Sequence, residues 1–264
     1  MNVISDRAAL LGDVPLRAHL VQLYDADEQV LAVNVARYLS EGLARGEGAV
    51  VIATPEHRAA FAREIAAGGA DAEAALAAGL LVMVDAAETL DALLVEGEPD
   101  PAQFAQIIGD LIGSVRERVG RAQVRAYGEM VGLLWESERY AAAIRLEELW
   151  NAELTSGGLA LFCAYPIDVF GDAFRIADVD ALLCAHTHLL PAGGDAMQRA
   201  VERAMHEVLG NRADGVRALM KANYRPSWAA LPKVEAEILW LRNNLPDDAE
   251  RILTRARTHY RDAA

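Results

Sequence analysis

Five short apolar runs, each followed by an amphipathic segment, constrain what this chain can fold into. The runs are HLVQLY (19–24), AVVIAT (49–54), LLVMV (80–84), VRAY (124–127) and LALFCAY (159–165). Runs of this length with little apolar–polar alternation suit strands that are buried on both faces. The segments between them show helical spacing, as at Leu31, Val35 and Leu39. The pattern predicts a three-layer α/β sandwich with a mostly parallel sheet of about five strands.

The character of the chain changes after Tyr165, where no further strand signal is found. The segment ADVDALLCAHTHLL is predicted to be one helix, capped by Asp178 and stopped before Pro191. Residues 196–264 have a helical pattern throughout. We therefore predict an α/β domain over residues 1–190 and an all-helical region over residues 191–264.

Composition limits which partners the protein can bind and which cellular compartment suits it. The chain has 264 residues and a formal net charge of −14, which disfavours direct binding to nucleic acid phosphates. Its two cysteines form no CxxC pair, so a reducing, cytoplasmic compartment fits. No apolar run approaches the ~20 residues of a membrane span, and the first residues lack the pattern of a signal peptide. We expect a cytoplasmic protein without membrane contact.

The corner after the first run is acidic and reads Tyr24-Asp25-Ala26-Asp27-Glu28. A phosphate site at such a strand–helix junction needs glycines, free backbone N–H groups and usually a lysine. None of these is present, and Asp25 with Glu28 has the spacing of a capping box. The corner therefore predicts no binding or hydrolysis of a nucleoside triphosphate.

The carboxyl ends of parallel strands meet at one edge of a sheet, where ligands of α/β proteins bind. Residues at the ends of the predicted strands mix apolar surface with hydrogen-bonding groups, as small-molecule sites do. The candidate ligand-binding residues are Tyr24, Asp25, Thr54, Tyr127, Glu129 and Tyr165. Tyr24 and Glu129 are the strongest candidates. His19 is a seventh, but it begins its strand and is expected about 16 Å from this edge at ~3.3 Å per residue.

Several blocks of the sequence resemble the MEDS domain, the methanogen/methylotroph, DcmR-type sensory domain. They are HLVQLYDADEQVLAVNVARYLSEGLARGEGAVVIATPEHRAAF, RAYGEMVGLLW, AIRLEELWNAEL and LALFCAYPIDVF, and the match spans roughly His19 to His188. The resemblance implies a derivative of the RecA/KaiC-like fold that has lost its nucleotide-binding loop. It also implies a sensor of small organic molecules that serves transcription regulators or histidine kinases. Within it, His19, Tyr24 and Asp25 match the opening signature, and Gly128-Glu129 a later one.

Other signals carry less weight. His206-Glu207 resembles the start of a histidine-kinase phosphoacceptor helix, although an ordinary exposed histidine is the favoured interpretation. Cys184 and His188 could share a helical face and bind a metal, but such a pair is more often structural. Three glutamates, Glu147, Glu148 and Glu153, are interpreted as a solvated helix face. No metal site and no cofactor are expected.

The sequence thus favours a non-enzymatic sensory protein that binds a small organic molecule and signals to a histidine kinase or transcription regulator. Its helical tail could also form a homodimer. The first alternative is a protein-interaction or histidine-phosphotransfer module that uses His206. The second, ranked last, is an enzyme with Glu129 as general base, because no nucleophile or metal site accompanies that carboxylate.

Overall fold

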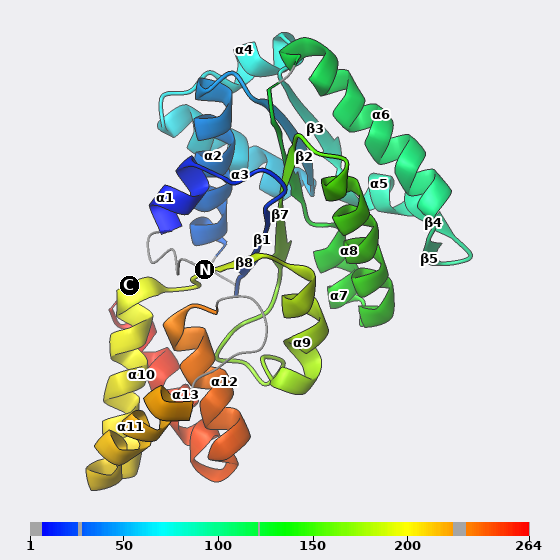
Figure 1. Cartoon of the computed structure of the whole chain (residues 1–264). Coiled ribbons are helices and arrows are strands. Elements are labelled where there is room, and N and C mark those ends of the chain that lie inside the picture. Colours follow the sequence, from blue (N-terminus) through cyan, green and yellow to red (C-terminus); the bar gives the residue numbers. More distant parts are fainter. Residues whose placement is uncertain (1–6, 26–27, 121, 224–230, 264) are drawn as a thin grey trace. The chain divides into compact units, whose positions relative to one another are not determined.

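The computed structural model describes residues 7–25, 28–120, 122–223 and 231–263. The chain divides into two compact units, Met1–Pro166 and Ile167–Ala264, and Figure 1 traces both along the sequence. The predicted boundary after residue 190 stays a prediction.

The first unit contains a parallel sheet of five strands. These are β1 (His19–Leu23), β2 (Gly48–Ala53), β3 (Leu81–Asp85), β6 (Val124–Gly128) and β7 (Leu159–Tyr165). They lie in the order β3-β2-β6-β7-β1, and each neighbouring pair is parallel. All five coincide with the predicted apolar runs, so the predicted α/β class and these five parallel strands are confirmed.

Helices cover both faces of this sheet, as Figure 1 shows. One face carries α1 (Arg7–Gly12), α2 (Gln29–Ala44) and α3 (Pro55–Ala67), and α4 (Ala72–Ala77) follows α3. The other carries α5 (Ala86–Leu93), α6 (Pro101–Val119), α7 (Met130–Glu136) and α8 (Tyr140–Thr155). A small antiparallel hairpin, β4 (Leu94–Val95) and β5 (Glu98–Pro99), lies between α5 and α6. Three layers are therefore present.

Local sequence explains where the first helices begin and end. Thr54 caps α3, since its side chain accepts from the backbone N–H of His57, and Pro55 occupies the first helical turn. Gly46 follows α2 with a φ of 77°, a left-handed conformation that glycine adopts without strain. On α2 the predicted apolar stripe, including Leu31, Val35 and Leu39, is fully buried.

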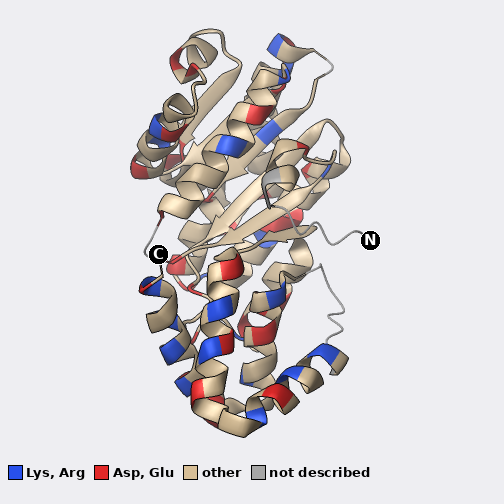
Figure 2. Cartoon of the chain, turned by 90° about the vertical axis from the view of Figure 1, so that its left-hand side faces the viewer, with Lys and Arg blue, Asp and Glu red and all other residues tan. Residues whose placement is uncertain are grey.

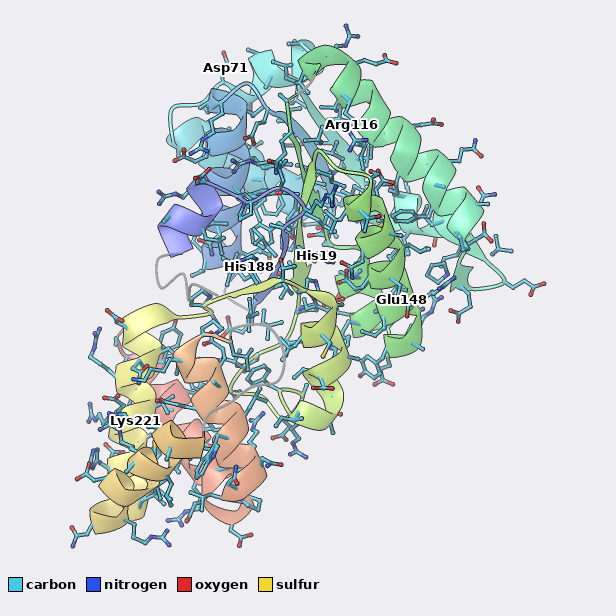
Figure 3. All side chains as sticks on the ribbon, in the orientation of Figure 1. His19, Asp71, Arg116, Glu148, His188 and Lys221 are labelled. Carbon is cyan, nitrogen blue, oxygen red and sulfur yellow. The ribbon has the colours of Figure 1, made fainter. Side chains whose placement is uncertain are left out.

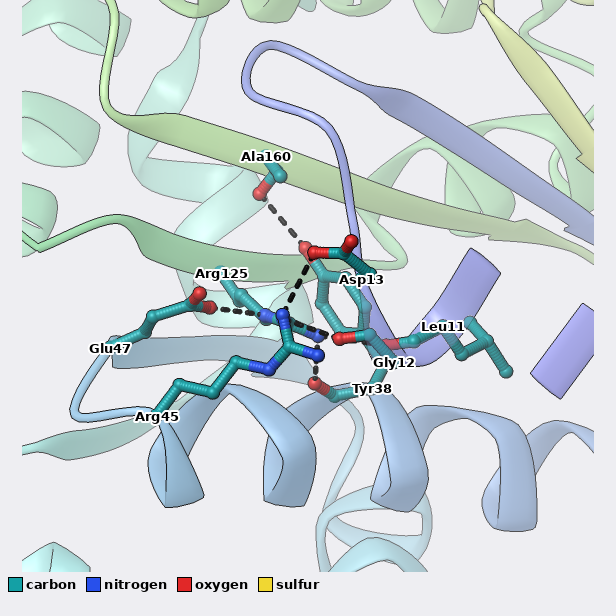
Figure 4. Close-up of polar contacts among 8 residues, drawn as sticks. All are labelled: Leu11, Gly12, Asp13, Tyr38, Arg45, Glu47, Arg125 and Ala160. Carbon is teal, nitrogen blue, oxygen red and sulfur yellow. Dashed lines mark hydrogen bonds and ion pairs between the residues drawn. The ribbon is translucent and has the colours of Figure 1, made fainter. Parts of the chain in front are cut away.

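A buried arginine ties α1 and α2 to the amino edge of the sheet, where the parallel strands begin. Arg125 of β6 is 1% exposed, and Figure 4 shows its guanidinium between α1, α2 and Glu47. It donates to the carbonyls of Leu11 at 2.8 Å, Tyr38 at 2.9 Å and Gly12 at 3.1 Å, and it pairs with Glu47. These charge-assisted bonds satisfy carbonyls at the end of α1 and within α2.

The second unit is mostly helical. Its elements are α9 (Ile176–Ala185), β8 (His188–Leu190), α10 (Gly194–Leu209), a 3₁₀ turn (Gly210–Arg212), α11 (Ala213–Asn223), α12 (Lys233–Asn244) and α13 (Pro246–Arg261). Helix α10 packs on α13, and Val201 of α10 and Ile252 of α13 are fully buried. Both acidic and basic residues are distributed along these helices, as the colours of Figure 2 show.

Every described element after residue 193 in this unit is helical, in agreement with the prediction for residues 196–264. The single helix predicted to run up to Pro191 is wrong. Helix α9 ends at Ala185, and His188–Leu190 forms a short strand. Apolar periodicity could not separate the two, because runs as short as three residues fit either state.

Candidate functional site

A buried carboxylate, Glu129, lies at the carboxyl edge of the sheet. It follows β6 and is 3% exposed. Its Oε1 accepts the backbone N–H of Thr54, and its Oε2 accepts the Tyr127 hydroxyl at 3.0 Å and contacts Nδ1 of His57 at 2.6 Å. The strand end of β2, the first turn of α3 and β6 therefore converge on one carboxylate.

The order of the strands explains this convergence. Strands β2 and β6 are neighbours, with Ile52 opposite Gly128, and the Glu129 N–H donates to the Ile52 carbonyl at 3.1 Å. The helices that follow these two strands, α3 and α7, lie on opposite faces of the sheet in Figure 1. Adjacent strands whose connections diverge in this way create the crevice in which open α/β sheets bind ligands.

His57 is held between two carboxylates. Its Nδ1 faces Glu129, and its Nε2 lies 3.2 Å from Oε2 of Glu28, whose side chain is 55% exposed. Burial alone would lower the pKa of His57, but the hydrogen bond and charge of Glu129, together with Glu28, raise it above its ordinary value. The ring also stacks on Phe61, with 5.6 Å between ring centroids. The two carboxylates thus favour the protonated, positively charged form of His57.

Two tyrosines complete this cluster. Tyr127 is fully buried, and the ring of Tyr24 meets the ring of His57 edge-on, with centroids 6.0 Å apart. Burial, and then the charge of Glu129, raises the pKa of both hydroxyls. Both therefore keep their protons near neutral pH and can act as hydrogen-bond donors. We call Tyr24, Thr54, His57, Tyr127 and Glu129 the rim cluster.

A second cluster of polar side chains lies under α8, between that helix and strands β1 and β7. His19, Glu147 and Cys163 are all 0% exposed. Nε2 of His19 lies 3.2 Å from Oε2 of Glu147 and 3.4 Å from Sγ of Cys163, and Cys163 Sγ lies 3.7 Å from the same Glu147 oxygen. Tyr165 donates to the other Glu147 oxygen at 2.6 Å, and Asn151 Oδ1 lies 2.9 Å from His19 Nδ1.

The pleat of the sheet accounts for this second cluster. Cys163 and Tyr165 are two residues apart on β7, so their side chains point to the same face. His19 lies opposite Leu161 on the neighbouring strand and faces the same way. Burial, and then the Glu147 carboxylate, raises the pKa of the Cys163 thiol and of the Tyr165 hydroxyl. We call His19, Glu147 and Cys163 the buried triad.

Comparison with protein families decides the identity. The model of the MEDS family (MEthanogen/methylotroph, DcmR Sensory domain) matches residues 18–187. The chain belongs to the MEDS family. No curated protein matches the sequence significantly. A sensory role is the role of this family, and both clusters lie within the MEDS match.

The MEDS domain brings together four of the seven predicted ligand-binding residues. Tyr24, Thr54, Tyr127 and Glu129 meet around His57, which the sequence analysis overlooked. The signal was present, because His57 follows a Thr-Pro helix start at the carboxyl end of a strand. Sequence separation hid its partner, since His57 and Glu129 are 72 residues apart.

The other three predicted residues lie elsewhere. His19 and Tyr165 belong to the cluster under α8, and Asp25 is exposed. The predicted Asp25–Glu28 capping box is wrong. Glu28 itself is the N-cap of α2, and its side chain makes no capping hydrogen bond, because it faces His57 instead. Ala26 and Asp27 lie outside the described residues.

The solvated face predicted for α8 is wrong at one position. Glu148 is exposed, and Figure 3 marks it together with His19. Glu147 is fully buried, because it shares a helical stripe with Ala143, Trp150 and Leu154. Cys184 and His188 do not share a helical face, as the predicted single helix would have allowed, since α9 ends between them.

A groove and the histidine of α10 lie apart from the rim cluster residues in the sequence. A groove of about 1090 Å³ is bounded by α2, α3 and α4, and none of the predicted site residues lines it. His206 lies on α10 with a side chain that is 49% exposed. Within the described ranges, no helix is long and apolar enough to cross a bilayer.

Proposed function

We propose that this MEDS protein is a non-enzymatic sensor that binds a small organic molecule at the rim cluster. The observation that carries the proposal is the Glu129 carboxylate, which is 3% exposed and takes bonds from three separate segments of chain. Burying a charge is costly unless it is fully paired. A sheet of this kind does not require such a charge at its edge, so its presence indicates a binding role.

The geometry around His57 favours one class of ligand. Its Nε2 lies 3.2 Å from the exposed carboxylate of Glu28. A small molecule with an oxygen acceptor, such as a carbonyl, hydroxyl or carboxylate group, would replace Glu28 there and lie against Tyr24. Since Glu28 is the N-cap of α2, ligand occupancy would change the first turn of that helix.

The same geometry argues against phosphate ligands. Asp25 and Glu28 stand at the corner where a nucleotide-binding loop would hold phosphates, and like charges a few ångströms apart repel by the order of 1 kcal/mol even in solvent. We therefore interpret the domain as a RecA/KaiC-like derivative whose nucleotide site has been replaced by the rim cluster.

The output is proposed to pass through the helices of the second unit to a histidine kinase or transcription regulator. The exposed position of His206 supports one alternative, in which a separate kinase phosphorylates this histidine. Incubation with a cognate kinase and labelled ATP separates the two. Label that disappears in His206→Ala supports the alternative, and absence of label supports a sensor that signals by contact.

The ligand proposal is tested by thermal unfolding of the full chain with a panel of small alcohols, ketones, carboxylic acids and halocarbons. A ligand at 100 times its Kd stabilises the protein by about 2.7 kcal/mol, so it raises Tm visibly. The proposal requires that Glu129→Gln reduces this rise for the active compound while Glu148→Gln does not. If no compound shifts Tm, or if both variants respond like the parent, the rim cluster is not the binding site.

A further inference from the structure

The buried triad has the spacing of ligands around one metal ion. We propose that Nε2 of His19, a carboxylate oxygen of Glu147 and Sγ of Cys163 bind one divalent transition metal ion. The three atoms are separated by 3.2 Å (N–O), 3.4 Å (N–S) and 3.7 Å (S–O), and they belong to a set of candidate metal ligands within 4.8 Å of one another.

These distances match the edges of a coordination tetrahedron. Zinc binds histidine nitrogen at about 2.05 Å, carboxylate oxygen at about 2.0 Å and thiolate sulfur at about 2.3 Å. At tetrahedral angles these bond lengths place the ligand atoms about 3.3 Å (N–O), 3.6 Å (N–S) and 3.5 Å (S–O) apart. Each observed separation lies within ~0.2 Å of its tetrahedral value.

Outer partners orient two of the three ligands. Asn151 Oδ1 lies 2.9 Å from His19 Nδ1 and can accept an Nδ1–H, the tautomer in which the Nε2 lone pair is available to a metal ion beside Glu147 and Cys163. Tyr165 holds the second oxygen of Glu147 at 2.6 Å. Metal-binding histidines and carboxylates are fixed by hydrogen bonds of this kind.

Charge supports the same assignment. A glutamate that is 0% exposed needs a positive partner, which is His19 when that ring is protonated and a metal ion when the ring is neutral. A divalent cation balances one carboxylate and one thiolate, and the Cys163 proton leaves to solvent when the sulfur binds. The mixture of nitrogen, sulfur and oxygen suits zinc best among divalent ions, and three protein ligands leave room for a fourth.

The test uses cobalt and zinc on the full chain. Protein unfolded in a chelator is refolded with Zn²⁺ or Co²⁺ and gel-filtered, because a fully buried site takes up its metal during folding. We expect about one metal ion per chain, and a sulfur-to-cobalt charge-transfer band in the near ultraviolet. The chain has two cysteines, so Cys184→Ser leaves only Cys163, and the band must survive in that variant.

Two further variants quantify the site. Cys163→Ser should lose the band and weaken zinc binding more than about 100-fold, since loss of an outer partner alone costs about 10–100-fold. Asn151→Ala should fall within that smaller range. The proposal is overturned if refolded Cys184→Ser contains no stoichiometric metal, or if its cobalt form lacks the charge-transfer band. This test holds even if Cys163→Ser fails to fold. No organic ligand is added, so the outcome is independent of the rim cluster.

Discussion

Glu129→Gln keeps the shape of the rim cluster and removes its charge. The parent carboxylate contacts the His57 ring at 2.6 Å and accepts the Tyr127 hydroxyl at 3.0 Å. A hydrogen bond to a charged partner contributes about 1.5–3 kcal/mol, and a neutral one about 0.5–1.5 kcal/mol. We expect the variant to lose about 1.5–3 kcal/mol of unfolding free energy where His57 is charged.

The loss should depend on pH with a definite sign. The pKa of His57 is raised in the folded state, above the ~6.5 of an unfolded histidine. Its stabilising effect is therefore complete below about pH 6.5 and disappears as the pH rises through the folded pKa. The difference between parent and variant should be largest near pH 6, and by about pH 9 it should shrink toward the value of a neutral hydrogen bond.

Urea unfolding followed by amide NMR signals of the first unit measures this difference, and the ring signals of His57 report its titration directly. In Glu129→Gln the burial of His57 remains while its main partner is gone, so its pKa should fall. Glu148→Gln, at an exposed carboxylate paired with Arg145 at 2.9 Å, is the control and should change nothing measurable. A stability gap that is the same at both pH values, or an unchanged His57 titration, would refute the reasoning.

Three other predictions follow from the packing and the acidic corner. Arg125→Met should lower the unfolding free energy measured in urea by about 3–5 kcal/mol, because it removes a buried cation from three carbonyls and a carboxylate. Arg45→Met, at an exposed ion pair, should leave the unfolding free energy unchanged. Equal effects of the two substitutions would contradict the role of the buried cation. Gly48→Ala would press its new methyl group into Val115 Cγ1 and should lower the unfolding free energy by about 1–3 kcal/mol. Gly113→Ala, with open space around it, should leave the unfolding free energy unchanged or raise it. A larger loss in Gly113→Ala than in Gly48→Ala would contradict the packing described for these positions. Isothermal titration with Mg-ATP should give no heat of binding, and a micromolar Kd would show that the acidic corner does not exclude phosphates.

Most of the fold could be predicted from the sequence because its signals are local. Each apolar run is long enough to specify a strand, and the Thr54-Pro55 pair marks the start of α3 through its own chemistry. The strand His188–Leu190 was not predicted, because its signal is too short. Its three residues carry no periodicity, so only the folded chain distinguishes them from the end of a helix.

The sites were less predictable because they depend on contacts between distant residues. Tyr127 and Glu129 are two positions apart and could be found together, but His57 joins them across 72 residues. Glu147 was interpreted together with Glu148 and Glu153 as a solvated helix face, because consecutive helix positions point about 100° apart and so do not form an acid–base pair. The helical stripe through Ala143 and Trp150 was the available signal that Glu147 points inward.

Native mass spectrometry of the protein purified from its own source tests the central claim most directly. We expect the parent chain and Glu148→Gln to retain a small organic molecule, and Glu129→Gln to lose it. Zinc, if held by the buried triad, would remain in all three and is distinguished by its mass. A parent chain without any organic adduct, or an adduct retained equally by Glu129→Gln, would contradict a sensor that binds its ligand at the rim cluster.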